Sequence, residues 1–302
     1  MNNKKEVKLI NKVKRLLKKA GIPRYLHHYG PKKYEFYNHA LAHLVRQECR
    51  LGYRRVTRLL RGLGIKCPCS SALCTNLHKI PLNLLKIIFA ATTSSKINLV
   101  ALDGTGLTRP LPSPNYYRRI DKPYPIDIHL KLSIAVDTRS KKILALRLRA
   151  SRAHDVRDAK YIINHLPRKP SKIVADKGYD ANWLHMYCVA KGIKTCIPMR
   201  DYGKTNPANP RKTLRKRLAK KFTKRTYGRR NIVESVFKVL NTRFGSSVSS
   251  VKFSAQRAEV YCRAIAYNVL LINLYFLNAP YIFNCPSLII KESIYIFLQK
   301  FK

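Results

Sequence analysis

Hydrophobic residues recur with two different periods along the chain, and the change comes near residue 94. Before that point, apolar residues return every three or four positions among lysines and arginines, which is the pattern of amphipathic helices. After it, short apolar runs bounded by turn residues alternate with further helical patterns, as in sheets whose strands are joined by helices. We therefore expect a helical region over 1–94, an α/β domain over 95–279 and an apolar extension over 280–302.

The helical region contains helical patterns over 10–17, 37–49, 53–63 and 72–80. Gly64 ends the third pattern, and Ser70 and Ser71 are placed to cap the fourth. Two helices joined by a glycine-containing turn, the second one short, are typical of a helix-turn-helix, whose second helix enters the major groove of DNA. The residues that would then face the DNA are Ser71, Thr75, Asn76 and Lys79. The alternative is a small helical bundle with a basic surface.

The eight cysteines form no even framework, as expected of reduced thiols in a cytosolic protein. One short tract nevertheless offers four possible zinc ligands, which are Cys67, Cys69, Cys74 and His78. Its spacing differs from the paired Cys-x2-Cys form of many zinc sites. A helix-turn-helix would also place Cys74 on the recognition helix, so zinc binding is the lesser alternative.

The second region has a regular order of elements. Strand patterns cover 97–102, 129–136, 142–148, 171–175 and 193–198, and helical patterns cover 155–166, 181–191 and 231–244. This order, βββαβαβα, predicts a hairpin meander followed by strand–helix alternation, and hence a mixed sheet with helices on its faces. It is the order of an RNase H-like fold, here of α/β class behind an all-α, helix-turn-helix-like N-terminal region. In open α/β sheets, ligands bind beyond the carboxyl ends of the strands.

The net charge of the chain predicts a polyanionic binding partner. The chain has 61 lysines and arginines against 15 aspartates and glutamates, a formal net charge of +46. Such a charge repels itself, so a polyanion such as nucleic acid is expected to neutralise it. The charge is spread along the chain rather than gathered on one membrane-docking helix. No signal peptide is visible, and Asn268, Asn273 and Pro280 interrupt the most apolar stretch, so we expect a cytoplasmic, nucleoid-associated protein without a membrane partner.

Three carboxylates stand out in this basic chain. Asp103 follows the apolar run 97–102, Asp176 follows 172–175, and Glu234 comes after a stretch, 211–230, in which 11 of 20 residues are Lys or Arg. Two strand-end aspartates and a helix glutamate are the kind of oxygen ligands that hold a divalent metal beside a phosphodiester. The alternative for Glu234 is a surface ion pair with a basic residue four positions away.

The other acids that compete for such a role are Asp121, Asp127, Asp137, Asp155, Asp158 and Asp180, and Asp137 is the strongest rival. Asp137 follows a strand, but the hairpin turn after it gives it a structural explanation. Asp155 precedes a helical pattern, and we expect it to cap that helix. The segment 116–119, Tyr-Tyr-Arg-Arg, is either a DNA contact or a packed aromatic loop.

The three acids lie in blocks that resemble those of the DDE transposases of prokaryotic insertion sequences. Residues 103–107, Asp-Gly-Thr-Gly-Leu, resemble the first block, and residues 175–180, Ala-Asp-Lys-Gly-Tyr-Asp, resemble the second. The third block has the family pattern Tyr-x2-Arg-x3-Glu-x6-Lys, matched here by Tyr227, Arg230 and Glu234. Asn241 stands where the family has the final lysine, and Lys238, one turn earlier, is the expected substitute. The resemblance covers residues 96–275.

This resemblance implies an RNase H-like catalytic core that cuts DNA at the ends of an element and transfers the freed 3′-OH into target DNA. Asp103 would bridge two Mg²⁺ ions, which Mn²⁺ can replace, and Asp176 and Glu234 would each complete one metal shell. Tyr227, Arg230 and Lys238 would contact double-stranded DNA, namely the inverted-repeat ends and the target. Synapsis of two ends implies a dimer or larger assembly. The alternatives are a catalytically inactive DNA-binding descendant and a metal-dependent RNase H-like nuclease or resolvase.

Overall fold

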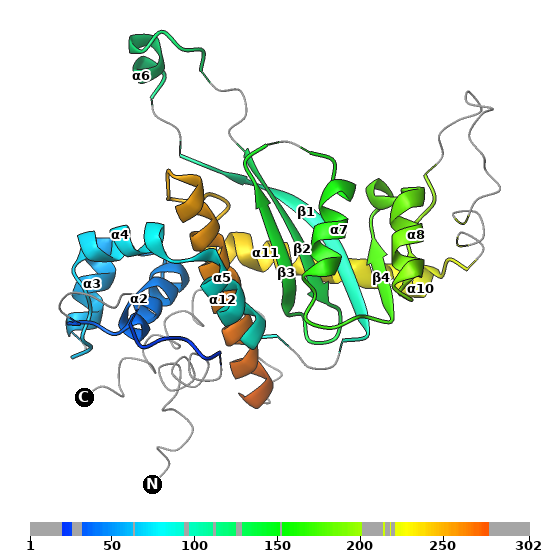
Figure 1. Ribbon diagram of the computed structural model, residues 1–302, viewed down its shortest axis with the longest axis horizontal. Helices are drawn as coiled ribbons and strands as arrows, with labels where there is room; N and C mark the ends of the chain where they lie inside the picture. Colours follow the sequence, from blue (N-terminus) through cyan, green and yellow to red (C-terminus); the bar gives the residue numbers. More distant parts are fainter. Residues whose placement is uncertain are drawn as a thin grey trace. The chain divides into compact units, whose positions relative to one another are not determined.

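The computed structural model describes residues 20–25, 32–62, 64–93, 97–110, 113–124, 129–151, 153–200, 214, 218 and 221–277. The chain divides into two compact units (Figure 1): the N-terminal part up to Thr92 together with the segment from Lys252 onward, and the segment Thr93–Val251 between them. The predicted helix over 10–17 and the extension over 280–302 lie outside the described residues, as do 211–213, 215–217, 219 and 220 of the basic stretch over 211–230.

The helical unit is built from amphipathic helices that bury one face each. Its described helices are α2 (Phe36–Glu48), α3 (Tyr53–Gly62), α4 (Ser70–Lys79), α5 (Leu82–Ala91) and α12 (Phe253–Leu277). Three of these match predicted helices to within two residues, and α5 follows α4 directly after Pro81. Leu41, Val56, Leu60 and Leu73 are among the residues that form its buried core. The apolar spacing of the sequence therefore produces the expected helices and places the expected side chains inside.

Helix α12 packs against α2, α4 and α5 and so belongs to this unit. The sequence-based division had assigned residues up to 279 to the α/β domain. Buried polar contacts explain the grouping with the N-terminal helices: Arg263 Nε donates to Gln47 Oε1 at 3.2 Å, and Asn268 Nδ2 donates to Thr92 Oγ1 at 2.9 Å. Among the described residues, no helix is both long and apolar enough to cross a membrane.

The α/β unit contains one mixed sheet. Its strands are β1 (Leu99–Thr108), β2 (His129–Asp137), β3 (Ile143–Arg149), β4 (Lys172–Ala175) and β5 (Lys194–Cys196), and their spatial order is β3-β2-β1-β4-β5. Strands β1, β2 and β3 pair antiparallel, whereas β1, β4 and β5 pair parallel. A meander of three strands followed by two parallel strands is the RNase H-like arrangement that the order βββαβαβα predicted.

Helices cover both faces of this sheet. The described helices of this unit are α6 (Pro114–Arg119), α7 (Val156–Asn164), α8 (Asn182–Ala190), α10 (Lys224–Tyr227) and α11 (Asn231–Phe244), with 3-10 turns η1 (Lys177–Tyr179) and η2 (Gly228–Arg230). Figure 1 shows α7 and α8 in front of the strands and α11 behind them. The front core includes Leu102, Ile162, Ile173 and Leu184. Helix α11 buries an apolar stripe of Val233, Val236, Phe237, Leu240 and Phe244.

Candidate active site

Asp103 and Asp176 lie at the same level of the sheet, on neighbouring parallel strands. The β1–β4 pairing ends at Leu102 and Ala175, so each aspartate is the next residue of its chain. The prediction that Asp103 ends its strand was wrong, because β1 continues to Thr108 through antiparallel pairing with β2. Asp103 is instead the first residue of β1 beyond its parallel partner. The shorter strand, β4, therefore sets the edge at which the two carboxylates meet.

The surroundings of Asp103 disfavour its ionised form more strongly than the surroundings of an exposed aspartate do. Burial, the largest cause, raises the pKa of Asp103, and the neighbouring carboxylates of Asp155 and Asp176 raise it further. The Gly104 amide, which donates to Asp103 Oδ1 at 2.8 Å, and the guanidinium of Arg230 act in the opposite direction. A cation beside this carboxylate would therefore favour its ionised form.

Glu234 reaches the same place from helix α11. The buried stripe of α11 packs on β1 and β2, whereas Glu234 is exposed in the first turn of the helix and Arg230 is its half-buried N-cap residue. Arg230 Nη1 lies 3.2 Å from Asp103 Oδ2, and Arg230 Nη2 lies 2.5 Å from Glu234 Oε1. The guanidinium also lies 5.9 Å from the centre of the Tyr227 ring. The pair of Arg230 with Glu234 is the surface ion pair that the sequence allowed, but its reach to Asp103 joins the first and third acids.

The three acids supply only carboxylate oxygens, the ligand type that Mg²⁺ and Mn²⁺ prefer. In the part of the chain that the structure describes, no three acidic, histidine or cysteine side chains are close enough to hold a metal ion as they stand. Arg230 is paired with two of the three candidate ligands. The donor set therefore fits a divalent metal in its chemistry, and the guanidinium is the group that a metal would replace.

A family model described as "Transposase DDE domain" matches residues 94–269, a segment that contains all three acids. The chain belongs to this family. No curated protein matches its sequence. Among solved structures, a piggyBac transposase synaptic complex with hairpin DNA is 11% identical over 95% of this chain and 82% of that chain, with a TM-score of 0.40. A simian T-cell lymphotropic virus intasome in complex with PP2A regulatory subunit B56 gamma is 13% identical over 70% of this chain and 68% of that chain, with a TM-score of 0.26. These likenesses are weak, and the family rests on the sequence match.

The rival acid Asp137 has a structural role in the transposase. Its carboxylate accepts hydrogen bonds from the Ser140 amide at 3.0 Å, the Ser140 hydroxyl at 2.5 Å and the Arg139 amide at 3.3 Å. These contacts close the turn between β2 and β3. The side chain of Asp137 therefore stabilises the hairpin turn, as its position in the sequence indicated.

Asp155 behaves differently from its prediction. It stands at the start of α7, but its side chain makes no capping hydrogen bond. It forms an ion pair with Lys131 of β2 instead. This pair lies against the backbone beside Asp103, because a Cβ atom built on Gly104 would come within 2.6 Å of Asp155 Oδ1. The capping prediction failed because long-range pairing with a lysine competed with the local amides.

Asp158, one turn further along α7, was missed as a structural centre. Its carboxylate is 1% exposed and accepts from Ser133 Oγ at 2.9 Å and Arg149 Nε at 2.5 Å. Arg147 Nη1 lies 3.1 Å from the same carboxylate. The available signal was the Arg147-x-Arg149 spacing, which places two cations on one face of a strand. This network fastens α7 to β2 and β3.

Asp180, in the second block, is tied to the last strand. Asp180 Oδ1 lies 3.0 Å from His185 Nε2, and His185 Nδ1 lies 2.8 Å from Thr195 Oγ1. The Arg200 amide donates to Asp180 Oδ2 at 2.6 Å. Both acid and histidine are buried. The arrangement connects η1, α8 and β5 behind Asp176, and it gives Asp180 a structural explanation.

Helix α4 presents the face that was predicted to meet DNA. Ser71, Thr75 and Lys79 are exposed and Asn76 is half-buried, whereas Leu73 and Leu77 of the opposite face are buried. The prediction that serines cap this helix was wrong, since Cys69 holds the N-cap position and Ser70 and Ser71 fall in the first turn.

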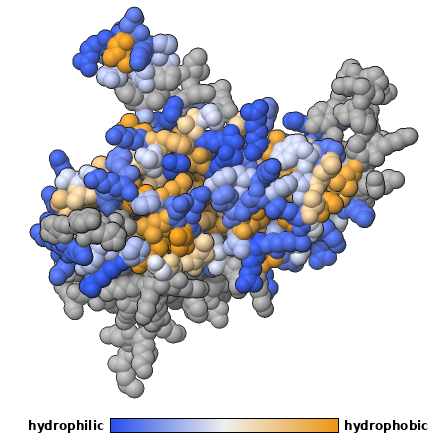
Figure 2. All heavy atoms as spheres, in the orientation of Figure 1, coloured by the Kyte–Doolittle hydropathy of each residue, from blue (hydrophilic) through white to orange (hydrophobic). Residues whose placement is uncertain are grey.

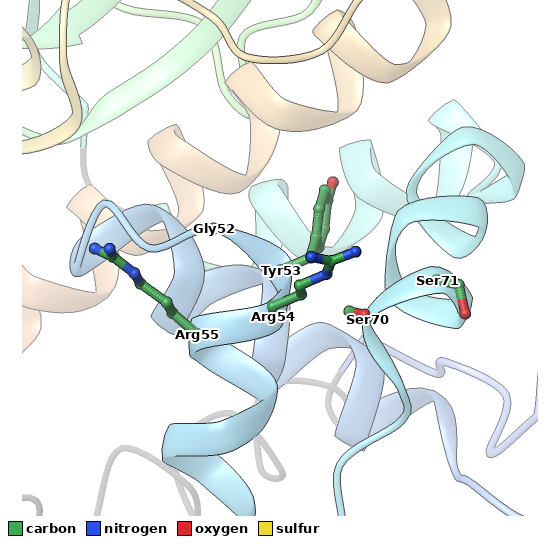
Figure 3. Close-up of a pocket in the computed structure, with 6 residues that line it drawn as sticks. All are labelled: Gly52, Tyr53, Arg54, Arg55, Ser70 and Ser71. Carbon is green, nitrogen blue, oxygen red and sulfur yellow. The ribbon is translucent and has the colours of Figure 1, made fainter.

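A groove of about 640 Å³ opens where α3 and α4 begin, and Gly52, Tyr53, Arg54, Arg55, Ser70 and Ser71 line it (Figure 3). In Figure 3, Arg54 extends to the side of the two serines and Arg55 to the other side. Exposed arginines continue along α3 at Arg58 and Arg61. Hydroxyls, guanidiniums and the amides of two helix N-termini are suited to a phosphate. The groove thus places Arg54 and Arg55 of α3 beside Ser70 and Ser71 of α4.

The four possible zinc ligands do not form a metal site in this structure. Cys67 is buried, whereas Cys69 and His78 are exposed, so the side chains do not converge. No group of metal-binding side chains occurs there, nor elsewhere among the described residues. Cys69 Sγ lies 3.3 Å from Ser71 Oγ instead, which gives it a local partner.

Helix α6 carries aromatic residues and arginines at an exposed position. Tyr117 makes edge contacts with Tyr116 and Tyr124, at centroid distances of 6.0 Å and 5.2 Å, and Arg119 lies 5.7 Å from the ring of Tyr116. Tyr116 and Tyr124 are each more than two-fifths exposed. Figure 2 shows mainly hydrophilic residues over this helix. The tyrosines thus pack on one another, as in the packed aromatic loop, while the arginines stay accessible; a DNA contact of this segment stays a prediction.

Proposed function

We propose that this transposase cuts DNA at the ends of its element and joins the freed 3′-OH to target DNA. One observation carries the proposal: Asp103 and Asp176 are adjacent in the strand register, and Glu234 is linked to Asp103 by a shared arginine. The three acids come from separate elements and are 73 and 58 residues apart, as the numbers 103, 176 and 234 give by subtraction. A basic chain has little other reason to gather carboxylates.

In this proposal Asp103, Asp176 and Glu234 hold two Mg²⁺ ions, which Mn²⁺ can replace. When bound, the ions neutralise charge on the phosphate and activate the attacking hydroxyl. Asp103 contributes from the rigid centre of the sheet, where neighbouring strands fix its backbone. Glu234 contributes from a helix surface, where its side chain is 52% exposed and can adjust to the substrate.

Helix α11 and the short segment that leads into it offer groups for the DNA end. Arg230 and Tyr227 lie beside the acids, and Lys238 follows one turn beyond Glu234 on the exposed side of α11. Asn241 is half-buried, so the exposed Lys238 is the better placed of the two to reach a phosphate. We assign Tyr227, Arg230 and Lys238 to the backbone of the DNA strand that is cut.

The helical unit would recognise the ends of the element. Ser71, Thr75 and Lys79 would meet base edges, and the groove with Arg54 and Arg55 would hold the neighbouring phosphates. Each phosphate contact releases counterions, so binding is expected to weaken steeply with salt. Because two DNA ends must be brought together, the working form is a dimer or a larger assembly of this chain.

The test is cleavage of duplex DNA that carries the flanks of the gene, with Mg²⁺ or Mn²⁺, by the wild type and by Asp176→Asn. A matched control is Asp121→Asn, which makes the same chemical change at an exposed residue with φ of 49°, a conformation that asparagine tolerates. We expect 3′-OH ends at the flanks from the wild type and the control, and none from Asp176→Asn.

The other outcomes separate the alternatives. Tight binding of the flanks without cleavage under either metal would identify a DNA-binding descendant that has lost the chemistry. Cutting of branched DNA irrespective of the flanks would identify an RNase H-like nuclease or resolvase. Equal cleavage by Asp176→Asn and the wild type would remove Asp176 from the site.

A further inference from the structure

Arg230 occupies a place that its role as a DNA contact does not explain. Its two terminal nitrogens are both directed to candidate metal ligands, Asp103 at 3.2 Å and Glu234 at 2.5 Å. The Arg230 side chain is 19% exposed, so it is inserted between them rather than lying on the surface. Asp176, by contrast, makes no hydrogen bond or ion pair through its side chain with any described residue. Of the three acids, Asp103 and Glu234 are therefore paired with Arg230, whereas Asp176 has no such partner among the described residues.

A guanidinium and a divalent cation compete for the same carboxylate oxygens. Arg230 uses one oxygen of Asp103 and one of Glu234. It also places a full positive charge in a partly buried space, where repulsion of a second cation is stronger than in water. A metal ion can take both ligands only after the guanidinium has moved away. The contacts around Arg230 therefore hold the site closed to metal while they persist.

A DNA phosphate is the partner that can draw Arg230 away. The planar fork of arginine binds phosphate in the same bidentate manner as carboxylate. Arg230 Nε is buried and has no hydrogen-bond partner among the described residues, so the guanidinium still has a donor to satisfy. The ring of Tyr227, 5.9 Å away, flanks the guanidinium on the same short stretch of chain. A modest change of side-chain rotamer would exchange two carboxylates for one phosphate.

We propose that Arg230 couples DNA binding to metal binding. Without DNA it pairs with Asp103 and Glu234 and keeps divalent metal out; when a DNA phosphate takes the guanidinium, both carboxylates are released to the metal. The inference rests on the proposed function, because it takes the three acids as metal ligands. Arg230 is thus a positioning residue that restricts metal binding, and with it cleavage, to the DNA-bound form of the site.

Coupling of this kind is reciprocal, so DNA strengthens metal binding by the same factor by which metal strengthens DNA binding. Couplings between protein sites typically amount to about 5- to 150-fold in affinity. The expected effect is therefore well above the error of a binding isotherm. It is also measurable without turnover, by using a duplex whose cleavage site carries a non-hydrolysable linkage.

The experiment measures Mn²⁺ binding to the full chain, by electron paramagnetic resonance of the free ion, with and without this duplex at constant ionic strength. Wild type is compared with Arg230→Gln and with Arg229→Gln, which removes the neighbouring exposed arginine. For the wild type and Arg229→Gln we expect the duplex to tighten Mn²⁺ binding by at least about 5-fold, which is the lower bound of such couplings. For Arg230→Gln we expect tighter Mn²⁺ binding than wild type without DNA, and little further gain with it.

Two results would overturn the inference: Arg230→Gln that keeps the wild-type gain on adding DNA, or Arg230→Gln that binds Mn²⁺ more weakly than wild type without DNA. Thermal unfolding checks that the variant is folded. If it is not, Arg230→Lys serves instead: lysine keeps the charge but cannot span both acids, so the gain in Mn²⁺ binding on adding DNA should fall below the wild-type gain, and an unchanged gain would overturn the inference.

Failure of the proposed function looks different. If Asp176→Asn binds Mn²⁺ as well as wild type, with and without DNA, the acids are not metal ligands. If Asp176→Asn abolishes binding while Arg230→Gln behaves as wild type, the metal site stands and only the exchange by Arg230 is wrong.

Discussion

His43 makes the helical unit sensitive to acid. Its side chain is on α2, is 2% exposed and meets the ring of Tyr53 edge-on at 6.3 Å. Burial, together with the positive charges of His39 and Arg46, lowers the pKa of His43 to about 3, and Asn76 opposes this only in part. In the unfolded chain a histidine titrates at about pH 6.5, so the folded and unfolded states bind different numbers of protons between these two values.

The direction and the size of the change in unfolding free energy with pH follow from that difference in bound protons. Between about pH 6.5 and pH 3 the unfolded chain carries a proton that the folded chain excludes, so stability is lost as the pH falls through this window. The slope is about 1.4 kcal/mol per pH unit, and the loss between pH 7.5 and pH 5.0 is about 2 kcal/mol. Replacing His43 by leucine removes the titrating group, so His43→Leu should lose about 2 kcal/mol less than wild type over the same interval.

The two units can be followed separately in this assay. The single tryptophan, Trp183, lies on α8 of the α/β unit, so its fluorescence reports urea unfolding there, while far-UV circular dichroism includes the helical unit. The control is His78→Leu, at an exposed position of α4, which should keep the wild-type pH dependence. Equal losses for wild type and His43→Leu between the two pH values would show that burial does not hold His43 neutral.

Three further substitutions test other parts of the structure. Asp158→Asn should lower the unfolding free energy of the α/β unit by about 3 kcal/mol, measured by tryptophan fluorescence, because it leaves the buried partners of that carboxylate without a counter-charge; an unchanged midpoint would contradict this. Gly104→Ala should push apart the Lys131–Asp155 pair, because the new Cβ would lie 2.6 Å from Asp155 Oδ1 and 3.0 Å from Lys131 Nζ. Since both side chains can move, the unfolding free energy should fall by less than about 1 kcal/mol; a larger fall would show that the pair is rigid. Arg54→Gln should reduce the slope of log K against log salt for DNA binding by about 1, as expected for one phosphate contact, and an unchanged slope would remove the groove from the DNA surface.

Elements with strong local signals could be predicted from the sequence. Helix α11 begins at Asn231 and ends at Phe244 as expected, because its apolar spacing is regular and Gly245 terminates it with a φ of 90°. The strand β1 could not be predicted in the same way. Its second half, Gly104-Thr105-Gly106, has no apolar periodicity, and only pairing with β2 keeps it extended.

The candidate site shows the same division between local and long-range information. The three acids were identified because each ends or begins a recognisable local pattern in a chain that has few acids. Arg230, which joins Asp103 to Glu234, was recognised only as a DNA contact, because its separation of 127 residues from Asp103 leaves no local trace. The lysine that holds Asp155 was missed for the same reason, since it lies on another strand.

The lack of a partner distinguishes Asp176 from the structural acids of this basic chain. Asp137, Asp158 and Asp180 are buried, and each is fully engaged with amides, hydroxyls or cations of its own fold. Asp176 is half-buried, and no described side chain pairs with it. A partly desolvated carboxylate without a partner weakens a fold unless a cation from outside compensates it. In a chain with a formal net charge of +46, where a lysine could have been placed beside it, an open acid is best explained by a ligand that the protein does not itself supply.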